Sequence, residues 1–98
     1  MVINRETAQL NKTFGNLCKV KDIAGREIAK AAYSDKWSNY GWNVDYILTQ
    51  SKKGKTTESN LTCCLIQTND EKADIFPCFT ANNKHFKIIK VLYHYEIN

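Results

Sequence analysis

The feature that most constrains this chain is the order of short patterned segments between residues 41 and 74. A strand-like run, "WNVDYIL", precedes a polar loop that contains glycine, "TQSKKGKTTES". A second apolar run, "NLTCCLI", follows, and the next stretch, "QTNDEKADIF", predicts a short helix that ends before Pro77. The segment therefore predicts strand, loop, strand and short helix in direct succession.

Alternation within the two apolar runs predicts which side chains share a face. Val44 and Tyr46 fall on one face of the first strand and Asp45 on the other. In the second strand, the adjacent Cys63 and Cys64 should point to opposite faces. No C-x-x-C pair is present to hold zinc, so we expect no zinc, and we expect the four cysteines to be buried apolar thiols.

The flanking segments predict a small α+β fold. Residues 4–14 predict a helix that is capped by Asn4, carries Leu10 and Phe14 on one face and ends at Gly15. Residues 17–30 predict a hairpin, and residues 33–43 a loop that packs its own aromatic side chains over the fold. Near the C-terminus, Asn82 and Asn83 tolerate left-handed backbone and predict the turn of a closing hairpin.

Composition limits the class of protein. The 98 residues fit one domain, residues 1–98, and the 43% hydrophobic content indicates a globular chain. We see no signal peptide or apolar run long enough for a membrane span, and we expect a cytoplasmic protein without a membrane partner. The net charge of +4 suits a polyanionic partner. The sequence leaves the oligomeric state open.

Residues 41–74 resemble the HNH endonuclease family, whose core is a ββα-metal finger. Asn60 lies 14 residues after position 46 and Asn69 lies nine residues after Asn60, which is where the family places its corresponding residues. The resemblance implies a small HNH-like ββα-metal finger with an N-terminal helix and flanking β-hairpins. The matching residues are Trp42, Asp45, Tyr46, Ile47, the loop "SKKGKTTESNL" and the run "TNDEKAD".

The resemblance also implies roles for individual residues. Asp45 and Asn69 take the positions of the metal ligands, for Mg²⁺ or Mn²⁺, and Asn60 takes the position that ties the loop by hydrogen bonds. One carboxylate and one amide would bind such a cation weakly. Asn69 could instead cap the short helix, and Asn60 could be a simple turn residue.

Tyr46 occupies the position of the family's general-base histidine. A phenol has an ordinary pKa of about 10, so it is a poor base at neutral pH. Loss of a general base typically costs about 10²–10⁴-fold in rate. We therefore expect catalysis to be impaired or absent, and Tyr46 to be a packing residue with its hydroxyl at the surface.

Three hypotheses of function follow. The leading one is a degenerate HNH-like protein that binds nucleic acid, with DNA as the expected partner, through the basic loop of Lys52, Lys53 and Lys55. The second is a phage or mobile-element protein that uses this scaffold to bind and inhibit a host defence protein, through the aromatic side chains of residues 33–42 and the C-terminal strand "VLYHYEI". The third is an active metal-dependent DNA endonuclease in which His85 or solvent takes the role of the base.

Overall fold

The computed structural model describes the chain from residue 5 to residue 98, with side chains from Gln9 onward. The predicted cap, Asn4, lies outside the described residues. No described helix has the length and apolar character needed to cross a membrane. The helices are α1 (Arg5–Phe14) and α2 (Ile66–Lys72), and the strands are β1 (Lys19–Lys21), β2 (Glu27–Ala29), β3 (Trp42–Tyr46), β4 (Leu61–Leu65), β5 (Cys78–Ala81), β6 (Lys84–Val91) and β7 (His94–Ile97).

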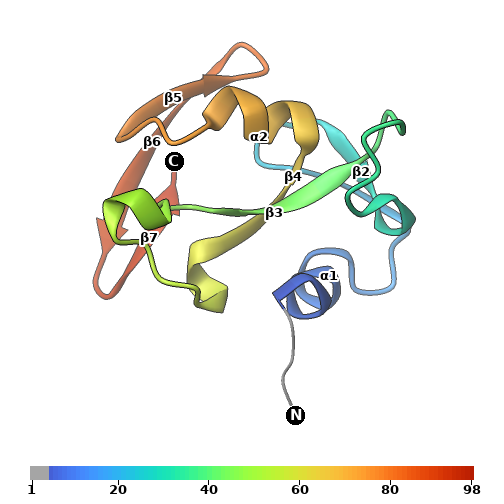
Figure 1. The fold of residues 1–98 in the computed structure, drawn as a ribbon, viewed down its shortest axis with the longest axis horizontal. Coiled ribbons are helices and arrows are strands. Elements are labelled where there is room, and N and C mark those ends of the chain that lie inside the picture. Colours follow the sequence, from blue (N-terminus) through green and yellow to red (C-terminus); the bar gives the residue numbers. More distant parts are fainter. Residues whose placement is uncertain (1–4) are drawn as a thin grey trace.

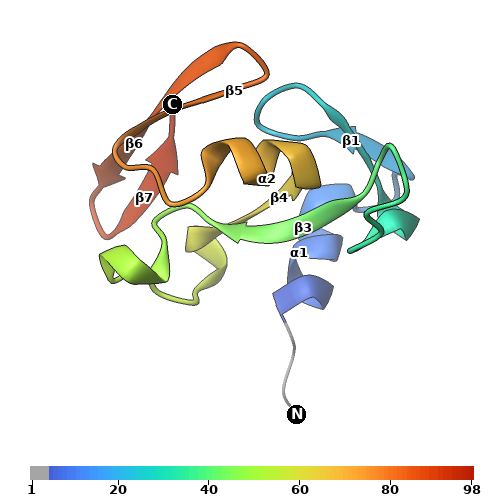
Figure 2. The same ribbon diagram turned by 45° about the horizontal axis from the view of Figure 1, so that its top comes forward.

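The predicted α+β character is confirmed. The antiparallel pair β3–β4 lies at the centre, with α1 on one side and α2 on the other (Figure 1). The hairpin β1–β2 and the three-stranded sheet β5–β6–β7 flank this centre at opposite ends (Figure 2). The described residues thus form three small separate sheets and two α-helices.

The N-terminal helix forms for the predicted reason. Phe14 is buried, and its ring centroid lies 5.3 Å from that of Trp42 in β3. Gly15 ends the helix with a left-handed φ of 54°, and its amide donates to the carbonyl of Asn11 at 3.1 Å. Ile28 of β2 and Cys63 of β4 complete this first hydrophobic cluster.

The predicted hairpin at residues 17–30 is confirmed as β1–β2, and Asp22 organises its turn. One carboxylate oxygen of Asp22 accepts the amides of Ala24 and Arg26 at 2.9 and 3.0 Å. The other oxygen accepts the amide of Leu65 at 3.0 Å, at the point where β4 gives way to α2. Gly25 has a φ of 85°, and a Cβ at this position would lie 2.8 Å from the Lys84 ammonium.

The short helix differs in its bounds from the prediction. It begins at Ile66, whose amide donates to the carbonyl of Gly41 at 3.0 Å, and it ends at Lys72, before Ala73 with its left-handed φ of 48°. The alternative that Asn69 caps this helix is wrong, since Asn69 lies inside it. The first turn is instead satisfied by tertiary partners that are distant in sequence.

The C-terminal segment forms more than the predicted hairpin. Asn82 and Asn83 have φ values of 52° and 60°, which confirms the turn between β5 and β6. A second turn at Leu92 and Tyr93 then adds β7, which the sequence analysis did not predict. The second hydrophobic cluster lies between this sheet and the β1–β2 turn, and its buried members are Ala24, Phe79, Ala81 and Ile88.

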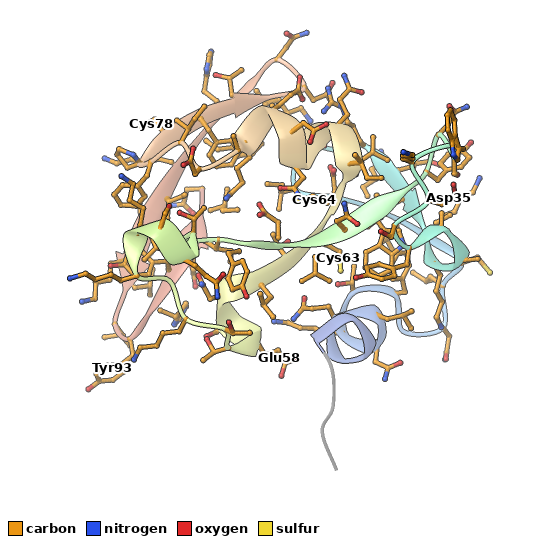
Figure 3. All side chains as sticks on the ribbon, viewed as in Figure 1. Asp35, Glu58, Cys63, Cys64, Cys78 and Tyr93 are labelled. Atoms are coloured by element: carbon orange, nitrogen blue, oxygen red, sulfur yellow. The ribbon has the colours of Figure 1, made fainter. Side chains whose placement is uncertain are left out.

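Two expectations about side-chain packing are partly wrong. Trp42 is buried, but Trp37 is 88% exposed, so the loop covers the core with only some of its aromatic rings. All four cysteines are free. Cys63 points toward α1 and Cys64 lies on the α2 side, both buried, as predicted (Figure 3). Cys18 and Cys78, by contrast, are exposed.

Candidate functional site

Asn60 is the anchor of the loop that joins β3 to β4. Its side-chain oxygen accepts the amide of Leu48 at 2.9 Å, and its Nδ2 donates to the carbonyls of Leu48 and Lys55 at 2.9 and 2.8 Å. The side chain is buried, and both hydrogen bonds to Leu48 are shielded from water, while the bond to Lys55 is partly buried. Gly54 tightens the same loop, because a Cβ there would lie 1.7 Å from the Leu48 carbonyl oxygen. The loop therefore has a fixed shape.

Asp45 is buried against an ammonium group that the sequence analysis did not assign to the site. The Nζ of Lys72, from the last turn of α2, lies 3.1 Å from Oδ2 of Asp45. The same Nζ donates to the Tyr46 carbonyl at 2.7 Å and lies 5.8 Å from the centroid of the Phe79 ring. Oδ2 is within ion-pair distance but is not aligned for a hydrogen bond. Lys72 is 0% exposed.

The electrostatics of this pair are dominated by its burial. Loss of hydration raises the pKa of Asp45 above its ordinary value of 3.8, and the nearby Lys72 ammonium offsets only part of that rise. The Asp45 carboxylate also raises the pKa of the buried Cys64 thiol, although burial is the larger cause there. Asp45 is thus a desolvated group whose charge depends on Lys72.

Tyr46 faces away from Asp45. Successive strand residues point to opposite faces, and Tyr46 pairs with Leu61 while Asp45 pairs with Thr62. The Tyr46 hydroxyl lies 2.9 Å from Oγ1 of Thr56 in the loop, where either group can donate. This placement gives Tyr46 a structural role, in which it ties the strand end to the loop.

Asn69 and His85 lie in other elements than Asp45, in α2 and β6. Asn69 is half-buried in α2, where its carbonyl accepts the amide of Ala73 at 2.8 Å. His85 is exposed in β6, and its Nδ1 lies 3.0 Å from Oγ1 of Thr80. Among the described side chains, no group of three or more His, Cys, Asp or Glu residues is placed to hold an ion.

The donor set does not fit a resident divalent cation in this arrangement. The carboxylate of Asp45 already has a buried cation, Lys72, at 3.1 Å. A second positive charge beside that ammonium would be strongly repelled in a low-dielectric surrounding. One carboxylate and one amide are also few ligands for Mg²⁺, which prefers six oxygens.

The lysines of the basic loop meet the C-terminal sheet in a groove, here called the lysine groove. It has a volume of about 360 Å³ and lies between residues 48–60 and the hairpin β6–β7. The turn η2 (Gln50–Lys52) lies beside β7 in both ribbon views (Figures 1 and 2). Its charged and aromatic lining side chains are Lys52, Lys53, Lys55, Lys90, Tyr93, His94 and Tyr95.

The structure thus brings the three predicted loop lysines to one groove and adds partners that the sequence analysis missed. Lys90 pairs directly with Tyr95 across β6 and β7, so both project near the same part of the sheet. The periodic "KVLYHYE" run was the available signal for β7, but it contains no residue typical of a tight turn.

Comparison with known proteins gives no match for this chain among protein-family models, characterised proteins or solved structures.

Proposed function

We propose that this protein binds nucleic acid on a degenerate HNH-like ββα scaffold, with catalysis impaired or absent. The observation that carries the proposal is the lysine groove, in which Lys52, Lys53 and Lys55 line a common surface with Lys90 and no acidic side chain. Asn60 fixes the loop that presents three of these ammonium groups, which reduces the ordering needed on binding. A fixed cluster of lysines suits a phosphate backbone.

Two observations support the loss of catalysis. Tyr46 stands at the position where the family resemblance places a general base, but a phenol is a poor base at neutral pH, and its hydroxyl lies 2.9 Å from Oγ1 of Thr56. Lys72 neutralises the carboxylate that would otherwise attract a metal. We expect Mg²⁺ or Mn²⁺ to bind weakly at most, because the ion would have to displace this buried ammonium.

The first test is binding of fluorescein-labelled DNA, followed by anisotropy from low to high salt. The variant Lys52→Gln/Lys53→Gln/Lys55→Gln should bind more weakly and should lower the salt slope by about 0.7–0.9 per lost phosphate contact. The matched control replaces three exposed lysines outside the groove, Lys19, Lys21 and Lys36, and should retain most of the affinity. Absence of binding to both duplex and single strand at low salt would refute the proposal.

A plasmid-nicking assay tests the loss of catalysis. We expect no nicking in Mg²⁺ or Mn²⁺ above the EDTA background, for the natural chain and for Tyr46→His, because the Lys72 ammonium already occupies the Asp45 carboxylate that would bind the ion. Nicking by the natural chain that Asp45→Ala abolishes would show instead that the protein is an active metal-dependent nuclease.

A second candidate function is inhibition of a host defence protein, as for a phage or mobile-element protein. Trp37 is 88% exposed, and Tyr33 and Tyr40 in the same loop are also exposed. Exposed aromatic side chains are enriched at protein interfaces. Inhibition of a purified defence nuclease that is lost in Trp37→Ala and kept in the variant Lys52→Gln/Lys53→Gln/Lys55→Gln would favour this candidate.

A further inference from the structure

The lysine groove concentrates positive charge far beyond the average of the chain. The whole sequence has a net charge of +4, from 14 basic and 10 acidic residues. The residues lining the groove include four lysines and no Asp or Glu. Four lysines that line one groove, with no acidic residue among its described lining residues, create a local positive potential, which favours a ligand with several negative charges.

One edge of the lysine groove carries an aromatic side chain in an unusual position. Tyr93 is 100% exposed, and it extends away from the body of the protein (Figure 3). The residue before it, Leu92, is 81% exposed and has a φ of 53°. Residues other than Gly, Asn and Asp rarely adopt this left-handed conformation. The turn carries a large aromatic ring, fully exposed to water, at the edge of the lysine groove.

Tertiary contacts fix the two walls of the groove relative to each other. The β7 strand packs against the turn η3 (Glu58–Asn60), and Asn60 in turn fixes the loop that carries three of the lysines. Tyr93 and Lys90 belong to the β6–β7 hairpin, which forms the opposite wall. One surface, built from the anchored loop and the β6–β7 hairpin, thus carries both lysines and an aromatic ring. This combination suits a ligand in which negative charges alternate with flat rings.

We propose that the lysine groove binds a single-stranded polynucleotide, with the lysines contacting successive phosphates and the ring of Tyr93 stacking on an unpaired base. In a duplex both faces of each base are covered by neighbouring pairs, so a protein ring can stack only where the strand is unpaired. This inference rests on the proposed nucleic-acid function and adds the strand type and the stacking residue. DNA and RNA share the chemistry of phosphodiester and base, and the test separates them.

The experiment uses the full chain and four probes. These are a fluorescein-labelled oligothymidylate of about 15 nucleotides, the matching oligouridylate, a duplex of the same length and inorganic polyphosphate as competitor. We expect the single strands to bind more tightly than the duplex. If the oligouridylate binds more tightly, the preferred ligand is RNA, recognised through its 2′-hydroxyls. If the oligothymidylate binds as tightly or more tightly, single-stranded DNA is also a ligand.

Variants at the turn test the stacking directly. Tyr93→Ala should weaken binding of the single strand by roughly 5- to 100-fold, since removal of a ring that stacks on a base typically lowers the affinity by this factor. Tyr93→Phe retains the ring and should bind like the natural chain. Trp37→Ala is the control, because it removes another highly exposed ring in the loop that carries Asp35. That loop lies at the opposite end of the molecule from Tyr93, so this variant should have no effect on binding (Figure 3). Because both side chains are exposed, these variants should keep the fold.

The lysine on the far wall provides an independent measurement. Lys90→Gln should reduce the slope of log affinity against log salt for the single strand by about 0.7, the value for one phosphate contact. If Tyr93→Ala and Lys90→Gln bind normally while the loop variant Lys52→Gln/Lys53→Gln/Lys55→Gln does not, the inference is overturned and the proposed function stands. Equal affinity for duplex and single strand, or equally strong competition by polyphosphate, also overturns it.

Discussion

The ion pair of Lys72 and Asp45 predicts a large and pH-dependent cost for a single substitution. Lys72→Met keeps most of the aliphatic stem against Phe79 but removes the ammonium that lies 3.1 Å from Oδ2 of Asp45. It also removes the donor to the Tyr46 carbonyl. Breaking a buried pair by deleting one partner typically costs about 3–5 kcal/mol, because the remaining charge stays desolvated. We expect a loss in the free energy of unfolding of this size at neutral pH.

The cost should decrease as the solution becomes more acidic. Burial raises the pKa of Asp45 above 3.8, so the folded state binds this proton more readily than the unfolded state. Stability linked to this carboxyl is therefore greatest below pH 4 and decreases as the pH rises through the folded pKa. In Lys72→Met the offsetting ammonium is gone, so the folded pKa rises further. The difference between variant and natural chain should be smallest near pH 4 and should increase toward neutral pH.

Urea unfolding, followed by tryptophan fluorescence across this pH range, measures the prediction. The double variant Asp45→Asn/Lys72→Met removes the stranded charge and should recover most of the loss, leaving about 1 kcal/mol for the unpaired Tyr46 carbonyl. Lys53→Met, at an exposed loop position, is the matched control and should change stability by less than about 0.5 kcal/mol. A loss below about 1 kcal/mol for Lys72→Met at neutral pH would show that the ammonium is not buried with Asp45.

Further predictions concern the loop and the thiols. Asn60→Ala removes three hydrogen bonds, two of them buried, and should lower stability by about 2–4 kcal/mol in urea unfolding, with faster hydrogen exchange at the Leu48 amide; unchanged exchange there would contradict its anchoring role. Gly54→Ala places a Cβ against the Leu48 carbonyl and should weaken oligonucleotide binding by reshaping the loop, whereas Lys55→Ala should lower affinity without altering loop exchange. In thiol titration with a disulfide reagent at pH 8, Cys18 and Cys78 should react rapidly, while Cys63 and Cys64 should react only on unfolding, because burial shields both and raises their pKa values. Rapid reaction of all four would show that the β3–β4 pair opens easily.

Local patterns were sufficient for the elements that local chemistry determines. The spacing of Leu10 and Phe14 before Gly15 predicted α1, and the Asn82–Asn83 pair predicted the turn between β5 and β6. Both depend on rules that operate within a few residues. The bounds of the other elements depend on tertiary contacts. The α2 helix begins at Ile66 because the carbonyl of Gly41, 25 residues earlier, accepts its amide.

Some residues of the candidate site could be predicted from the sequence, and others depend on tertiary contacts. The family spacing placed Asn60 where the structure uses it, as the anchor of the loop. It gave no indication of Lys72, since lysine is almost never fully buried and its partner Asp45 lies on a strand distant in sequence. The contribution of Tyr93 was equally hidden, because the Leu92–Tyr93 turn has none of the residues that normally signal a hairpin.

The division of the apolar interior into two clusters affects how the protein opens. The cluster around Phe14 and Trp42 shares no residue with the cluster around Phe79 and Ile88. The region around one cluster can therefore unfold locally while the other stays folded. An excursion that detaches the C-terminal sheet would carry Lys90 and Tyr93 away from the anchored loop while the remainder stays native. Such partial opening would release a bound single-stranded nucleic acid without global unfolding, so the lifetime of the proposed complex would depend on the stability of the cluster around Phe79 and Ile88.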